Sequence, residues 1–387
     1  SLSLLSDVLR DLLDPRLRSG NPAAVRARTA FAARADRPAS RGRSAVRAAD
    51  TDTGRPDDTL LSVRDLRVEF RFGERILHPV NGVSLDLRRG EAVGLVGESG
   101  AGKSVTLLSV LGLVPSPPGR IIDGRIGFAG LDLADAPAGM LQRIRGRRIA
   151  YVPQHPGASF NPVLRIGTQI AEVARLHGEP GRREAWMRAL QALRRAHAGH
   201  PERVARSYPH QLSGGQRQRA AIAMALVNEP EILLADEPTT ALDVTTQARI
   251  LRLLDSLRAD SDLSILLVWH DIGVLAGFCD PLHVMYAGQV VETGSAEAIV
   301  RSPLHPYTRR LIDSIPVLGH PQRTLDAIPG LPPALDQLPP GCAFAPRCDR
   351  ARAECRDLEV ALEQPVEGRL VRCIRQAGTT GAAHGST

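Results

Sequence analysis

From residue 60 onward, short apolar runs alternate with stretches in which apolar residues recur at helical spacing. The runs are too short for helices and have the length of buried strands. They occupy residues 92–96, 149–152, 232–235 and 265–269, and helices are expected to begin near Lys103, Ser213 and Thr245. Because strands and helices alternate, the pattern predicts an α/β fold with a parallel sheet covered by helices.

Three regions of the chain differ in pattern and composition. In residues 1–58, leucines at helical spacing precede an Ala-, Arg- and Pro-rich stretch without periodicity, so we expect a short helix and a disordered linker. Residues 59–302 carry the strand–helix alternation, and about 155–225 are predicted to form a helical insertion. Residues 303–387 are rich in Pro, contain four of the five cysteines, and are interpreted as a separate appendage.

The net charge of +7 is concentrated in one segment. Residues 16–49 contain nine Arg and one acidic residue, while the rest of the chain is close to neutral. A solvated arm or attraction to anionic lipid explains this segment. Aromatic residues make up 3% of the chain, too few to suggest stacking surfaces for nucleic acid, so no nucleic-acid partner is expected.

Apolar runs are also short by the standard of membrane proteins. None approaches the roughly 18 residues that a transmembrane helix needs. The apolar start contains Asp7, Arg10 and Asp11, which a secretory signal would lack. A soluble chain in the cytoplasm is therefore expected.

The strongest chemical signal follows the first apolar run and opens the first predicted helix. It fits the phosphate-binding loop pattern, in which successive backbone N–H groups and a helix N-terminus surround phosphate oxygens. Lys103, the only lysine in the chain, is expected to reach the β- and γ-phosphates of ATP, and the Ser104 hydroxyl to bind Mg²⁺. The loop consists of Gly97, Glu98, Ser99, Gly100, Ala101, Gly102, Lys103 and Ser104.

Two further segments complete the expected chemistry. The apolar run 232–235 ends in Asp236 and Glu237, which are suited to bind Mg²⁺ and to act as general base toward the attacking water. A second anion site is predicted at the helix start formed by Ser213, Gly214, Gly215 and Gln216. Since the first loop already serves one nucleotide, this site is best explained if it caps a nucleotide held by a partner domain.

Together these motifs resemble the ATP-binding subunit of ABC transporters, whose signature is Leu-Ser-Gly-Gly-Gln. The resemblance implies the P-loop (RecA-like) fold of an ABC nucleotide-binding domain, ATP hydrolysis and dimerisation with a second ABC domain. It places Gln154 in a loop that senses the membrane partner and helps to bind Mg²⁺, and His270 at the γ-phosphate. It also implies that Asp243 touches the opposite site and that Phe70 stacks on adenine; a core aromatic is the other interpretation of Phe70.

Further segments resemble the dipeptide, oligopeptide and nickel importer subfamily. They are residues 208–213, 235–244, 285–288, 303–308, 328–330 and 341–348. The resemblance implies an importer ATPase on the cytoplasmic face of the membrane, working with two permease subunits and an extracytoplasmic substrate-binding protein. Oligopeptides or dipeptides are the expected cargo, with nickel or a metallophore as the alternative. Residues 5–18 look like the C-terminal tail of such a permease.

Four cysteines in the last region form a candidate metal site: Cys342, Cys348, Cys355 and Cys373. Because a reducing cytoplasm disfavours disulfides, zinc, an iron–sulfur cluster or free thiols remain. The closely spaced cysteine pairs usual in zinc sites are absent from this sequence. The subfamily resemblance implies a [4Fe–4S] cluster.

Two other classes of protein share the nucleotide motifs. Soluble ABC ATPases of DNA repair or translation generally carry two such domains or a long coiled coil, and neither is evident in this sequence. Exporters of drugs or lipids usually lack a cysteine-bearing tail. The importer interpretation therefore fits the whole chain best.

Overall fold

A computed structural model describes residues 58–155, 159–178, 181–239, 243–315 and 328–374. The predicted N-terminal helix and basic linker lie outside these residues. The strands are β1 (Thr59–Phe72), β2 (Arg75–Arg88), β3 (Ala92–Val96), β4 (Gly119–Phe128), β5 (Leu131–Asp132), β6 (Ile149–Val152), β7 (Ile232–Asp236), β8 (Ser264–Trp269), β9 (Pro281–Tyr286), β10 (Gln289–Ser295), β11 (Glu363–Val366) and β12 (Arg369–Val371). The α-helices are α2 (Lys103–Val110), α3 (Ala138–Ile144), α5 (Ile166–Gly178), α6 (Arg182–Arg195), α7 (Pro201–Arg206), α8 (Gly214–Leu226), α9 (Val244–Ser261), α10 (Ile272–Ala276), α11 (Ala296–Arg301), α12 (Pro306–Asp313) and α13 (Glu354–Asp357); two 3₁₀ turns, η3 (Pro209–Gln211) and η4 (Ala345–Arg347), are also present.

The larger sheet has eight strands in the order β11-β12-β10-β9-β3-β8-β7-β6. Its section from β9 to β6 is parallel and contains all four predicted strands. Every residue of β3, β7 and β8 is buried. Burial on both faces explains why these strands read as unbroken apolar runs. The predicted parallel sheet is thereby confirmed.

A second, antiparallel sheet with the order β2-β1-β4-β5 was not predicted. Its apolar side chains pack with those of α2 and of the larger sheet in one core. Charged residues such as Arg64 and Asp65 interrupt the alternation along β1. The sequence pattern of β1 is therefore weaker than that of the buried parallel strands.

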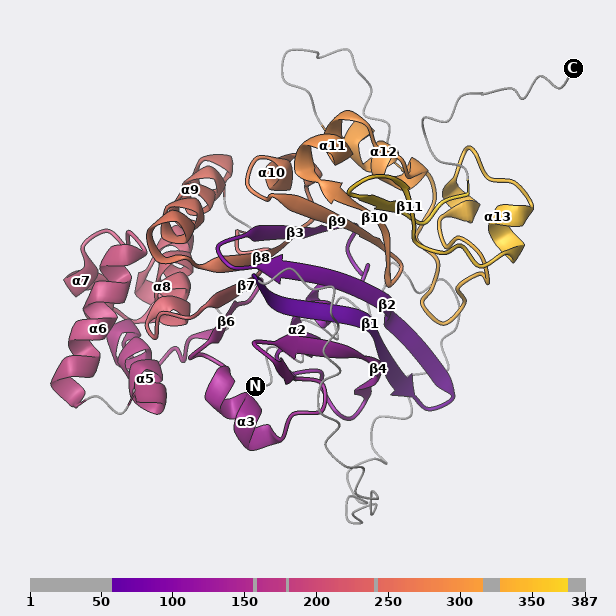
Figure 1. The fold of residues 1–387 in the computed structure, drawn as a ribbon. Helices are drawn as coiled ribbons and strands as arrows, with labels where there is room; N and C mark the ends of the chain where they lie inside the picture. Colours follow the sequence, from indigo (N-terminus) through magenta and orange to yellow (C-terminus); the bar gives the residue numbers. More distant parts are fainter. Residues whose placement is uncertain (1–57, 156–158, 179–180, 240–242, 316–327, 375–387) are drawn as a thin grey trace, which may run out of the picture.

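The helical region consists of α5 to α8, within the predicted insertion at about 155–225. Its helices pack through small side chains, including Ala185 and Ala189, which are fully buried. Figure 1 shows this region beside the β6 end of the larger sheet, with α9 next to it.

The cysteine-bearing C-terminal region is joined to the larger sheet, which corrects the expectation of a separate appendage. β12 pairs antiparallel with β10, and the buried Arg369 side chain forms an ion pair with the fully buried Glu292. Figure 1 shows this region at the opposite end of the sheet from α5–α8. The free edge of β10 supplies the backbone partners that make this attachment possible.

Candidate nucleotide site

The loop between β3 and α2 has the tight backbone that a phosphate-binding loop requires. A Cβ atom on Gly97 would lie 2.1 Å from the carbonyl oxygen of Met285. At Gly102, φ is 102°, and a Cβ atom would lie 1.9 Å from the carbonyl oxygen of Pro79. Neither position has room for a side chain, so both glycines are required by close backbone contacts.

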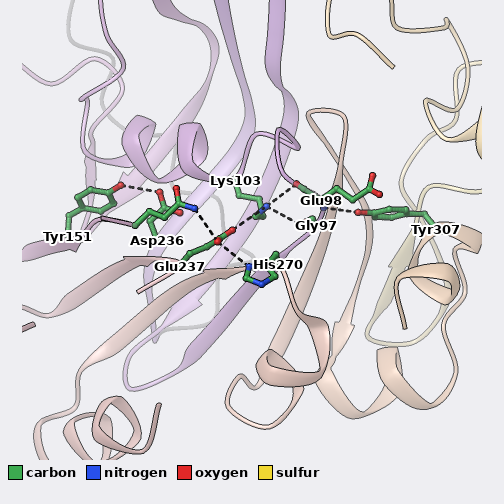
Figure 2. A network of polar contacts seen from close by, with 9 residues as sticks. Gly97, Glu98, Lys103, Tyr151, Asp236, Glu237, His270 and Tyr307 are labelled. Carbon is green, nitrogen blue, oxygen red and sulfur yellow. Dashed lines mark hydrogen bonds and ion pairs between the residues drawn. The ribbon is translucent and has the colours of Figure 1, made fainter. Parts of the chain in front are cut away.

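Lys103, the first residue of α2, is folded back over this loop. Its side chain is 5% exposed, and Nζ donates hydrogen bonds to the carbonyl oxygens of Gly97 at 2.9 Å and Glu98 at 3.0 Å. The same nitrogen lies 4.0 Å from Oε1 of Glu237 (Figure 2). A buried ammonium at the start of a helix makes the loop strongly attractive to anions.

Asp236 ends β7 and is almost completely buried. Its Oδ2 accepts a hydrogen bond from the Tyr151 hydroxyl at 3.1 Å, while Oδ1 has no hydrogen-bond partner within the described part of the chain. Burial raises the pKa of this carboxyl to about 6, although the neighbouring Ser104 hydroxyl opposes the shift. A buried carboxylate oxygen without a donor, next to a serine hydroxyl, suits an oxygen-seeking cation such as Mg²⁺. Sequence reasoning missed Tyr151.

Glu237 follows β7 with φ of 41°, a left-handed conformation that is unfavourable for a residue with a side chain. Its Oε2 accepts a hydrogen bond from Gln154 Nε2 at 3.2 Å and lies 3.1 Å from His270 Nδ1. Figure 2 shows Lys103 and His270 converging on this carboxylate. The hydrogen bond to Glu237 raises the pKa of His270. The structure therefore brings together Lys103, Gln154, Glu237 and His270, which are far apart in the sequence.

The predicted second anion site forms the start of α8. Ser213 is its N-cap: Ser213 Oγ accepts from the Gln216 backbone N–H at 3.3 Å, and Gln216 Oε1 accepts from the Ser213 N–H at 3.1 Å. This capping box fixes a helix start at which Ser213 is exposed and both glycines are partly exposed. None of these contacts involves the phosphate loop, so the two predicted anion sites are separate.

Asp243 caps the neighbouring helix, α9. Its Oδ1 accepts from the Thr246 backbone N–H at 2.9 Å, and its Oδ2 accepts from the Thr246 hydroxyl at 2.7 Å. Both hydrogen bonds lower the pKa of Asp243, and the one from the Thr246 hydroxyl has the larger effect. Ala241 and Leu242, which precede it in the motif, lie outside the described residues.

Comparison with known proteins agrees with this geometry. A family model described as ABC transporter matches residues 80–240, and one described as oligopeptide/dipeptide transporter, C-terminal region, matches 291–355. The oligopeptide transport ATP-binding protein AppD of Bacillus subtilis (strain 168) is 45% identical over 316 residues, covering 82% of this chain and 96% of its own. The chain belongs to the ABC transporter family of ATP-binding proteins. Its members are ATPases, and this chain is an ABC ATPase.

Other relatives support the same assignment. The probable peptide ABC transporter ATP-binding protein y4tR of Sinorhizobium fredii is 43% identical, over 82% of this chain and 95% of its own. A dimeric structure of the ATP-binding cassette MJ0796 in a post-hydrolysis state, bound to ADP and Pi, is 31% identical with a TM-score of 0.55. The match covers 61% of this chain and 99% of the cassette.

In the described part of the chain, none of the helices combines the length and the apolar character that a membrane span needs.

In this ABC ATPase, Phe70 does not lie where it could stack on adenine, contrary to the prediction. Its side chain is fully buried and meets the position where a Cβ on Gly119 would lie, so it cannot reach a nucleotide. Phe72, two residues along the same strand, is only partly buried, and its ring stacks on Phe70 at a centroid distance of 6.5 Å. Both aromatics fit the sequence pattern, and only their burial distinguishes them.

The four cysteines of the C-terminal region line one cavity, together with residues that include His305 and Phe344. Burial raises the pKa of the thiols of Cys342 and Cys348. Among the described residues, however, no three His, Cys, Asp or Glu side chains lie close enough to hold a metal ion. The thiols thus have the right chemistry and a common cavity for a metal centre, but not the converged arrangement of a formed one.

Proposed function

We propose that this ABC ATPase is the motor subunit of a membrane importer for oligopeptides or dipeptides. The observation that carries the proposal is the Glu237 carboxylate held beside the phosphate loop by Gln154 and His270, in a chain with an oligopeptide-transporter type C-terminal region. Relatives named as oligopeptide and peptide transport ATP-binding proteins support the cargo class.

In the proposed mechanism, residues 97–104 bind the phosphates of ATP through backbone N–H groups, and Lys103 neutralises the β- and γ-phosphates. Ser104, Gln154 and Asp236 would hold Mg²⁺, which would neutralise charge on the phosphates. Glu237 orients the attacking water and accepts its proton. His270 fixes the Glu237 carboxylate and reaches the γ-phosphate.

A complete site requires a second ABC domain in this proposal. The exposed helix start at Ser213–Gln216, with its backbone N–H groups, closes over the nucleotide on the partner, and Asp243 contacts the partner's site. The separation of this helix start from the chain's own phosphate loop supports the arrangement, as do the dimeric cassettes among the similar structures. ATP binding then closes the dimer and hydrolysis releases it.

The proposed assembly has two permease subunits and an extracytoplasmic substrate-binding protein, with this chain on the cytoplasmic face of the membrane. Cargo selection belongs to the permease and binding protein. A direct test reconstitutes the chain in liposomes with permease and substrate-binding subunits of a peptide importer and measures ATP-dependent uptake of labelled oligopeptide, dipeptide and nickel. Uptake of peptide supports the proposal; uptake of nickel alone contradicts the cargo, and ATP hydrolysis unaffected by permease contradicts the motor role.

We also propose that Cys342, Cys348, Cys355 and Cys373 bind a [4Fe–4S] cluster with a structural role. Four cysteine thiolates are the usual ligand set of such a cluster, and all four thiols border one cavity. Binding would deprotonate thiols whose pKa burial now raises, and would draw them together. Residues 329–346 are rich in Pro and Gly and contribute few large apolar side chains of their own, so a metal staple would stabilise this segment.

A further inference from the structure

Arg347 of the cysteine-bearing region contacts the phosphate loop directly. Its guanidinium donates from Nη1 to Oε2 of Glu98 at 2.6 Å and from Nη2 to Oε1 at 3.0 Å. Glu98 is the second residue of the phosphate loop, 249 positions away in the sequence. Paired hydrogen bonds of this kind fix orientation as well as distance.

The Arg347 side chain is built into its position and is not a mobile surface group. It is 5% exposed, and its remaining donors reach the carbonyl oxygens of Pro329 at 2.8 Å and Ile328 at 3.3 Å. The Tyr286 hydroxyl, at the end of β9, lies 3.2 Å from Nη1. A guanidinium bound on all sides cannot move away from Glu98 without leaving several buried groups unpaired.

Glu98 in turn is held at three points. Its carboxylate pairs with Arg347, its backbone N–H donates to the Tyr307 hydroxyl at 2.9 Å, and its carbonyl oxygen accepts from Lys103 Nζ at 3.0 Å. Figure 2 shows Glu98 between Lys103 and Tyr307. Any shift of the Glu98 peptide therefore moves one of the carbonyl oxygens that hold the Lys103 ammonium, which is expected to bind the phosphates.

The cysteine-bearing segment also supports the loop indirectly, through the tyrosines beside Glu98. Phe344 packs against Tyr286 and Tyr307, at centroid distances of 5.3 and 5.4 Å, and those two rings lie 4.6 Å apart. Phe344 and Arg347 both lie between Cys342 and Cys348, in a turn closed by the hydrogen bond from Arg347 N to Phe344 O at 2.9 Å. One short segment thus carries the charged contact to Glu98 and an aromatic contact to Tyr307, whose hydroxyl accepts the hydrogen bond from the Glu98 N–H.

From this geometry we infer that Arg347 is a positioning residue for ATP binding. It holds Glu98, and through the Glu98 peptide it sets the place of Lys103. The C-terminal region is then part of the nucleotide site, not only an attachment to the sheet. The inference rests on the proposed role of residues 97–104 in ATP binding.

The test measures the ATP dissociation constant, KM and kcat of the full-length protein and of six variants. Arg347→Ala removes the clamp, Arg347→Lys keeps the charge without the paired geometry, and Glu98→Gln removes the partner charge while leaving the C-terminal region intact. The double variant Arg347→Ala/Glu98→Gln completes a cycle. Arg310→Ala is the matched control, because Arg310 pairs at 2.8 Å with the exposed Asp349 of the same region, and none of its hydrogen bonds within the described residues reaches the loop.

We expect Arg347→Ala and Glu98→Gln each to raise the dissociation constant and KM by about tenfold or more, as for a lost charge-assisted hydrogen bond. The double variant should be no worse than the poorer single variant, Arg347→Lys should recover only part of the affinity, and kcat should change less than KM. Arg310→Ala should bind ATP like wild type.

Unchanged ATP affinity in Glu98→Gln, or effects that simply add in the double variant, would overturn the inference. Should Arg347→Ala fail to fold, Glu98→Gln and Arg347→Lys still decide the question. Lys103→Ala distinguishes the proposed role of the loop from the role of Arg347. Normal ATP binding by Lys103→Ala contradicts the proposed role of the loop. Loss of ATP binding by Lys103→Ala, with no effect of Glu98→Gln, contradicts only the role of Arg347.

Discussion

His270 Nδ1 lies 3.1 Å from Oε2 of Glu237, across the carboxyl ends of two neighbouring parallel strands, β8 and β7. The His270 side chain is 58% exposed and that of Glu237 is 13% exposed. The Glu237 carboxylate is therefore largely buried among protein groups, whereas the His270 imidazole is largely exposed to solvent. This arrangement gives the candidate base a fixed orientation before any nucleotide binds.

Replacing Glu237 with Gln should leave ATP binding intact and lower turnover by about 100- to 10,000-fold, because the amide cannot accept the proton of the attacking water. The variant should also accumulate as a closed dimer with ATP, detectable by light scattering. Glu297→Gln, at an exposed position on α11, is the control. Hydrolysis within threefold of wild type would exclude Glu237 as the base.

Lys103→Arg should fail to support normal ATP binding although the charge is kept. The ammonium is 5% exposed and fits between the carbonyl oxygens of Gly97 and Glu98, where a larger planar guanidinium does not fit. Titration with a fluorescent ATP analogue measures the effect. Affinity close to that of wild type would show that the loop needs only a positive charge.

Phe70 and Phe72 should behave differently when changed to Ala. Phe72→Ala should weaken ATP binding by about 1–3 kcal/mol, the usual contribution of a base stacked on an aromatic ring, with little loss of stability. Phe70→Ala should instead destabilise the fold by about 3–5 kcal/mol, because Phe70 is fully buried. Thermal unfolding and ATP titration of both variants check this pair. Weakened ATP binding by a stable Phe70→Ala protein would reverse the assignment.

His283 on β9 should make the fold sensitive to mild acid. Burial lowers the pKa of His283 to about 4, whereas the unfolded chain protonates it near its ordinary value of 6.5. Between these values the unfolded state binds the proton and the folded state does not. Stability is therefore fully present above pH 6.5 and falls as the pH drops toward 4, by up to about 1.4 kcal/mol per pH unit.

Urea unfolding at several pH values tests this in wild type and in His283→Gln, which keeps a side-chain partner for the Thr293 hydroxyl. The pH dependence between 6.5 and 4 should become shallower in the variant. It should not vanish, because burial also lowers the pKa of His305, to about 3. Parallel pH profiles for the two proteins would contradict the assignment to His283.

Protein purified without air should contain about four irons per chain if the cluster proposal is right. Cys342→Ser/Cys348→Ser should lose the iron and make the C-terminal region more sensitive to protease. Cys279→Ser, a buried cysteine outside the cavity, is the control and should keep the iron. Stoichiometric zinc without iron, or no metal at all, would contradict the cluster.

The sequence alone identified the parts of this protein that depend on contiguous residues. The phosphate loop, the strand ending in Asp236 and Glu237, and the helix start at Ser213 are each specified by local backbone requirements, so their spacing is visible in the chain. The buried strands of the parallel sheet were found for a similar reason, because burial on both faces demands an uninterrupted apolar run.

Only the tertiary structure decided which distant residues meet. It buries Phe70 and leaves Phe72 partly exposed. It also pairs β12 with β10 and places the Arg347 guanidinium against the Glu98 carboxylate. Each outcome depends on long-range packing: an alternating strand pattern does not say which face is covered, and a lone arginine among many carries no sign of its partner. Such contacts are formed when the sheet and the core position their residues, which is why no local pattern predicted them.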